Sequence, residues 1–91
     1  MSIYGAAKER AERLAHSTSV RFPQVSWHII DGYEDDSTVD VQLEWTCAPD
    51  GEQEEAQAEA ICGDFESFRD VEMQDSGMLD GASWVTFRVS P

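Results

Sequence analysis

The chain has 91 residues, of which 41 % are hydrophobic, which is enough for a single domain around one core. Nineteen acidic residues against six basic ones give a formal net charge of −13. A surface of this charge repels phosphate backbones, which disfavours direct nucleic-acid binding, and no apolar run approaches the ~20 residues that cross a membrane. The N-terminal residues lack the basic and apolar segments of a signal peptide, so we expect a cytoplasmic protein.

The first half of the sequence predicts a helix followed by two strands. Over residues 2–18 apolar residues recur every three or four positions, which is typical of an amphipathic helix, and Phe22-Pro23 ends it. A strand is expected over residues 24–31. After a polar turn, apolar and polar residues alternate strictly over residues 38–47, which predicts a strand with one buried and one solvated face.

The second half predicts the same order of elements. Asp50 is a suitable N-cap for a helix that extends to about residue 67. A short strand is expected over residues 70–75, a turn over 75–81, and a last strand over 82–90.

The two halves, about residues 1–46 and 47–91, align without a gap at an offset of 46 residues. In this alignment apolar strand residues meet apolar strand residues: Phe22 with Phe68, Val25 with Val71, Val39 with Val85, Val41 with Phe87 and Leu43 with Val89. The alignment predicts a duplicated αββ unit within one domain.

Two such units predict an α+β two-layer sandwich, in which a four-stranded antiparallel sheet carries both helices on one face. The predicted strand order is 3-4-2-1, a permuted ferredoxin-like arrangement. The second and fourth strands are the longest and most apolar, as central strands should be. The third strand is then an edge strand whose charges discourage aggregation.

The uncovered face of this sheet is a candidate contact surface. It is expected to carry Trp84 among polar residues, and an exposed tryptophan is a typical anchor in a protein interface. The alternative is that Trp84 packs under the 75–81 turn or against a terminus.

The acidic residues are concentrated in the middle of the chain, where residues 31–70 hold fourteen acids and one base. One interpretation is a surface that imitates a phosphate backbone and binds a basic protein surface. The alternatives are a solvated face or adaptation to a salt-rich host. The residues that we expect to contact such a partner are Tyr33, Glu34, Asp35, Asp36, Asp40, Glu44, Glu52, Glu54, Glu55, Glu59 and Trp84.

The sequence has no nucleophile elbow, glycine-rich phosphate loop or calcium-binding loop. Cys47 and Cys62 lack the spacing of a redox or zinc motif and are interpreted as buried thiols. We therefore expect no enzyme, no metal site and no cofactor.

The leading hypothesis is a non-enzymatic module that occupies the basic nucleic-acid-binding groove of a host enzyme or defence complex. In size and composition, though in no motif, the chain resembles the small acidic proteins by which phages and mobile elements inhibit such machinery as DNA mimics. The alternative is a structural module that self-associates through its open sheet face or edge strand, so that the protein is a monomer or a homodimer. A small enzyme or ligand binder is a third possibility.

Overall fold

The computed structural model describes residues 3–32 and 37–91. Its elements alternate one helix with two strands, twice, in the order α1 (Ile3–Arg21), β1 (Ser26–Gly32), β2 (Val39–Thr46), α2 (Gly51–Glu66), β3 (Val71–Leu79) and β4 (Ala82–Val89). Asp50 caps α2 as predicted, because its carboxylate accepts a hydrogen bond from the Glu52 N–H over 2.7 Å. Among the described residues, no helix is long and apolar enough to cross a membrane.

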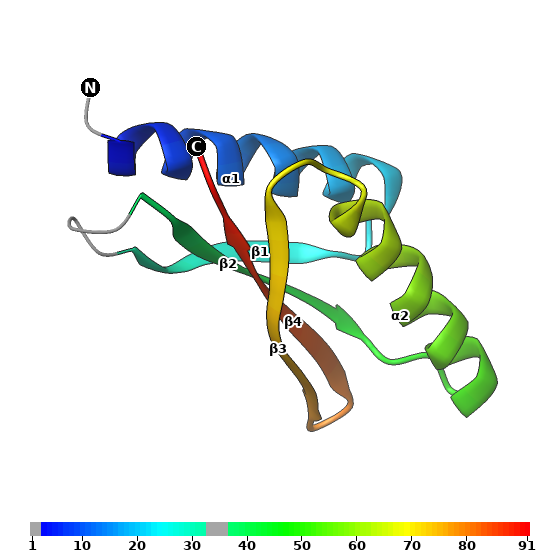
Figure 1. Ribbon diagram of the computed structural model, residues 1–91. Helices are drawn as coiled ribbons and strands as arrows, with labels where there is room; N and C mark the ends of the chain where they lie inside the picture. The colour runs from blue at the N-terminus through cyan, green and yellow to red at the C-terminus, as the bar shows by residue number, and fades with distance from the viewer. Residues whose placement is uncertain (1–2, 33–36) are drawn as a thin grey trace.

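The four strands form one antiparallel sheet in the order β1-β2-β4-β3, which is the predicted order read from the other edge (Figure 1). Buried residues of both helices pack against the same side of the sheet, so the predicted two-layer α+β sandwich is confirmed. At its centre the ring of Phe65 from α2 stacks on Phe87 from β4, with centroids 4.6 Å apart.

The predicted duplication relates the two central strands. Val41 of β2 pairs with Phe87 of β4, and these two residues are 46 positions apart. On either side of this pair Val39 meets Val89 and Leu43 meets Val85, so the two strands are related by an approximate twofold axis between Val41 and Phe87.

The edge strands depart from the ungapped alignment by two residues. Trp27 of β1 pairs with Leu43, whereas Met73 of β3 pairs with Phe87, the counterpart of Val41. Trp27 therefore occupies the place in its half that Val71 occupies in the other. Because the slip is of two residues, each edge strand still presents the same set of side chains to the helices.

The prediction of a turn over residues 75–81 is wrong, because β3 continues to Leu79. The register shifts between Met73 and Asp75, so a bulge at Gln74 interrupts the alternation that a strand should show in sequence. The strand then ends in a two-residue turn at Asp80-Gly81, with φ angles of 52° and 80°. Two positive φ angles are those of a tight hairpin turn, for which Asp-Gly is a preferred pair.

Candidate functional site

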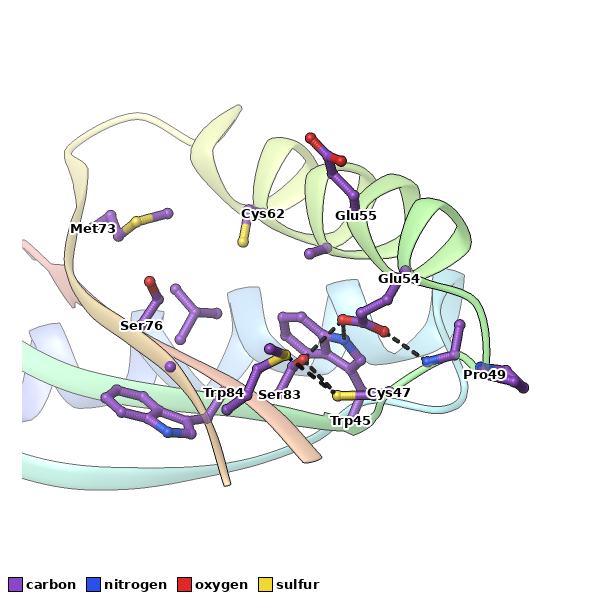
Figure 2. Close-up of a pocket in the computed structure, with 16 residues that line it drawn as sticks. Trp45, Cys47, Pro49, Glu54, Glu55, Cys62, Met73, Ser76, Ser83 and Trp84 are labelled. Carbon is purple, nitrogen blue, oxygen red and sulfur yellow. Dashed lines mark hydrogen bonds between the residues drawn. The ribbon is translucent and has the colours of Figure 1, made fainter. Parts of the chain in front are cut away.

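A groove lies between α2 and the β3–β4 hairpin. Figure 1 shows α2 and the hairpin joined near the C-terminal end of the helix and diverging from there. The space between them has a volume of about 630 Å³ and holds side chains from β2, α2, β3 and β4 (Figure 2). Trp45 and Val85, both buried, form its floor.

The two walls of the groove are mainly apolar. Ala58 and Cys62 of α2 form one wall, and Met73 and Met78 of β3 form the other. Ile61 and Phe65 of the same helix are fully buried, whereas Ala58 and Cys62 are only half-buried and border the groove.

The sequence suggested Glu54 as a partner contact, but its carboxylate is hydrogen-bonded within the chain at one end of the groove. Its carboxylate accepts hydrogen bonds from Trp45 Nε1 at 3.0 Å, from the Ala48 N–H at 2.8 Å and from Ser83 Oγ at 2.8 Å. Gln57 Nε2 donates a further bond at 2.7 Å. One carboxylate thus joins the first turn of α2 to β2, to β4 and to the segment between β2 and α2 (Figure 2).

The pKa of Glu54 reflects two opposing effects. Burial raises it, but the hydrogen bonds from Ala48, Trp45, Ser83 and Gln57 together lower it further, so the net pKa lies below the ordinary value. Glu54 is therefore ionised at neutral pH, with its oxygens occupied by donors of this chain. It is a structural residue, and we remove it from the surface offered to a partner.

Sulfur atoms gather at the same end of the groove. Cys47 Sγ lies 3.7 Å from Met78 Sδ and 3.1 Å from Ser83 Oγ. Cys47 and Cys62 are both free thiols, as the sequence suggested, but they are half-buried rather than buried, because both line the groove. Burial, and secondarily the charge of Glu66, raise the pKa of the Cys62 thiol to about 11, so it is protonated at neutral pH.

The solvent side of α2 is acidic. Glu52, Glu55, Glu59 and Glu66 are all exposed and follow one another at helical spacing, so they form a stripe along the outer face of the helix. Glu55 also lines the groove. We call Glu52, Glu55, Glu59 and Glu66 the acidic stripe. Three of them, Glu52, Glu55 and Glu59, are predicted contact residues, and they lie together beside the apolar groove.

The remaining predicted contact residues lie elsewhere. Asp40 and Glu44 are on the sheet face away from the helices, where Asp40 accepts a bond from Arg88 Nε at 3.1 Å and Glu44 accepts one from the Gln42 amide. The two carboxylates are thus engaged within the chain. Tyr33, Glu34, Asp35 and Asp36 lie outside the described residues.

Trp84 lies on the open sheet face, as predicted, but it is half-buried. Its indole covers Gly77 of the neighbouring strand: a Cβ atom at Gly77 would lie 2.8 Å from Trp84 Cζ2. Figure 2 shows the ring directed away from α2, in contrast to Trp45. The tryptophan fills the space above a glycine, which makes it part of the sheet's own packing.

The groove itself was not predicted from the sequence. The signal that was available is the Asp80-Gly81 pair, which predicts a tight hairpin and hence a longer β3. A longer β3 would have placed Met78 beside Cys47 and Ser83 on the helix side of the sheet.

No family model, curated protein or solved structure matches the chain. The site therefore has to be interpreted from its own chemistry. Within the described residues no group of three or more histidine, cysteine, aspartate or glutamate side chains is placed to hold a metal ion. The groove combines an apolar floor with an acidic rim, which suits a ligand that has apolar and basic parts.

Proposed function

We propose that the protein is a binding module that places the acidic stripe of α2, and the groove beside it, against a basic surface of a partner protein. The expected partner is an enzyme or defence complex that handles nucleic acid, because such proteins carry basic grooves that recognise rows of negative charge. Occupation of that groove would inhibit the partner.

The observation that carries the proposal is the position of the acidic stripe along one rim of an apolar groove. Charges steer association and set specificity, whereas buried apolar contacts supply most of the affinity in protein interfaces. Glu52, Glu55 and Glu59 are exposed, and among the described residues no hydrogen bond or ion pair holds their carboxylates in the way that Glu54 is held. Their charge is therefore directed to solvent.

The test replaces Glu52, Glu55 and Glu59 by lysine in one variant. Partners are captured from a host lysate at low salt, once with the wild-type protein and once with this variant. Each captured protein is then purified and bound to a labelled DNA duplex, and the displacement of the duplex by the wild-type protein or by the variant is measured. The proposal expects that the wild-type protein captures a DNA-binding protein and displaces the duplex, and that the variant does neither.

A matched control keeps the experiment specific. Lysine at Glu9 and Glu12 of α1 reverses charge away from the acidic stripe and from β3, so this control should capture and displace like the wild-type protein. Equal loss in both variants would show an effect of net charge alone. Capture without displacement of the duplex would contradict the inhibitory role.

A second candidate function is self-association, which the exposure of Met78 and Leu79 on edge strand β3 favours. Opposing it, a second copy would bring its own Glu72 and Asp75 to the same edge. Light scattering over a range of salt concentrations separates the two functions: a dimer stable at low salt supports assembly, whereas a monomer supports the binding module.

A further inference from the structure

We propose that an extended basic segment of the partner adds to the outer edge of β3 as a fifth strand and so closes the groove between α2 and β3 on that side. The segment would direct alternate apolar side chains to the helix side of the sheet, beside Met73 and Met78, and the intervening lysine or arginine side chains to the opposite face, beside Glu72 and Asp75. This inference rests on the proposed function, since it names the part of the partner that the module holds.

The first support is the place of β3 in the sheet. It is the outermost strand beside β4, so among the described residues one side of its backbone has no neighbouring strand. A row of N–H and C=O groups at a sheet edge is the surface to which an extended peptide adds in strand-addition complexes. The nine residues Val71–Leu79 provide a long edge for this.

The second support is the distribution of apolar side chains along that edge. Met73 is 41 % exposed and Met78 is 70 % exposed, and both line the groove. Methionine adapts its shape to different apolar partners and is common on surfaces that bind varied peptides. An apolar side chain of the added strand, on the helix side of the sheet, would lie beside these two methionines.

The negative charge around the edge of β3 favours a basic segment as the added strand. Asp70, Glu72 and Asp75 lie at or beside β3, and the acidic stripe lies on the helix that forms the opposite wall. A second copy of this chain would bring the same carboxylates to the same edge, and like charges in adjacent strands are destabilising. A basic segment instead brings lysine or arginine side chains beside Glu72 and Asp75, so the edge disfavours a second copy and favours a cationic strand.

The probe for the test is a fluorescein-labelled peptide of nine residues in which valine alternates with lysine, and binding is followed by fluorescence anisotropy. The critical variant is Met78→Lys, and the matched control is Leu79→Lys. The two side chains are adjacent and equally exposed, at 70 % and 69 %, but Met78 lines the groove and Leu79 does not. Both variants add one positive charge, so the change in net charge is the same in each.

The inference expects Met78→Lys to raise the Kd about tenfold or more relative to Leu79→Lys, as for the loss of a central apolar contact. The wild-type protein with bound peptide should also protect Cys47 and Cys62, which line the groove, from alkylation several-fold, measured by mass spectrometry. Equal affinity of the two variants, or unchanged alkylation, would overturn the inference.

A second measurement tests the strand geometry. In an added strand every second peptide N–H faces β3, so N-methylation of one alternate set of residues should abolish binding and N-methylation of the other set should leave it nearly unchanged. Equal effects of the two sets would exclude strand addition. A dimer of the protein alone that Met78→Lys dissociates would identify a second copy as the occupant and would also overturn the inference.

The failures of the two proposals are distinguishable. If charge reversal in the acidic stripe abolishes capture from lysate but Met78→Lys leaves it unchanged, the groove inference is wrong and the proposed function stands. If charge reversal leaves capture unchanged, the proposed function is wrong whatever the peptide does.

Discussion

The hydroxyl of Thr18 donates a hydrogen bond of 2.7 Å to the carboxylate of Asp64, a residue 46 positions further along the chain. The separation equals the offset that aligns the two halves of the sequence. The two residues are therefore counterparts, one in α1 and one in α2, and they meet where the helices cross. In the sheet, Val41 and Phe87 have the same separation of 46 residues and are likewise paired directly.

The two counterparts have different side chains, and the carboxylate of Asp64 also accepts hydrogen bonds from a third residue, Arg21. Arg21 donates to Asp64 through Nε at 2.7 Å and through Nη2 at 2.8 Å, a bidentate pair. Its guanidinium also lies over the ring of Phe68, 5.8 Å from the centroid. Asp64 thus joins the end of α1 to α2, and hydrogen bonds from Arg21 hold its pKa below the ordinary value of 3.8.

Replacement of Asp64 by alanine should destabilise the fold by about 1–3 kcal/mol, because the fully buried Thr18 hydroxyl loses its acceptor. The stabilisation by Asp64 is complete above the ordinary aspartate pKa and is lost as the pH falls through the lower folded value. Urea unfolding of both proteins should therefore show a difference at pH 7 that narrows in acid. Glu66→Ala, an exposed change on the same helix, should cost no more than about 0.5 kcal/mol at either pH.

The sequence was sufficient to predict most of the fold, since strict alternation in β2 and β4 and the helical spacing of apolar residues report burial directly. The strand order followed from the duplication together with the length of the central strands. The extent of β3 was not predictable from alternation, because the bulge at Gln74 changes which residues face the helices. The slip of two residues in the edge strands was hidden for a related reason: it preserves the faces and so leaves no trace in the pattern.

Glu54→Gln should destabilise the protein by about 2 kcal/mol, although the two side chains have the same shape. An amide presents one acceptor and one donor group, so part of the set of donors from Trp45, Ala48 and Ser83 would face another N–H group. The loss should be largest at neutral pH and shrink as Glu54 itself becomes protonated in acid, because its folded pKa is depressed. Urea titrations at several pH values measure both effects.

The neighbour Glu55 offers the control for this prediction. It is exposed on the same turn of α2, so Glu55→Gln should change stability by no more than about 0.5 kcal/mol. A similar loss in both variants would mean that the carboxylate at position 54 has no special structural role.

Replacement of each of two glycines by alanine should change the stability of the protein in opposite directions. A Cβ atom at Gly77 would lie 2.8 Å from the indole of Trp84, so Gly77→Ala should destabilise the sheet by about 1–3 kcal/mol. A Cβ atom at Gly63 in α2 would meet nothing within 4 Å, so Gly63→Ala should stabilise the protein by up to about 1 kcal/mol through helix propensity. Thermal unfolding of the two variants measures both shifts, and stabilisation by Gly77→Ala would show that Trp84 moves aside at no cost.

The candidate site was predictable only in part. The charges of Glu52, Glu55 and Glu59 could be assigned to an exposed helix face from spacing alone. The separation of Glu54 from them could not, because it depends on the indole of Trp45 and the hydroxyl of Ser83, which reach it only after the sheet has formed. Trp84 posed the reverse problem: its position on the open face was predictable, but its cover over Gly77 depends on the pairing of β3 with β4.

The charge of −13 makes a last prediction, on salt. Raising the ionic strength from 0.01 M to 1 M shortens the screening length from about 30 Å to about 3 Å, which weakens repulsion between carboxylates but also the exposed pairs Arg21–Asp64 and Arg88–Asp40. Acids far outnumber bases, so relief of repulsion should dominate and the free energy of unfolding should rise with salt.

The acidic stripe should account for part of this rise. Neutralisation of Glu55, Glu59 and Glu66 to glutamine should stabilise the protein at low salt and reduce the slope against salt, whereas Glu12→Gln, which removes the partner of Lys8 at 3.9 Å, should do neither. Urea unfolding at low and high potassium chloride measures both slopes. If the variant of Glu55, Glu59 and Glu66 keeps the wild-type dependence of the unfolding free energy on salt, the repulsion lies elsewhere in the chain. The glutamates of α2 are then spaced widely enough not to destabilise the fold. If its slope falls, the fold maintains these charges at the expense of its own stability, as expected of residues kept for a partner.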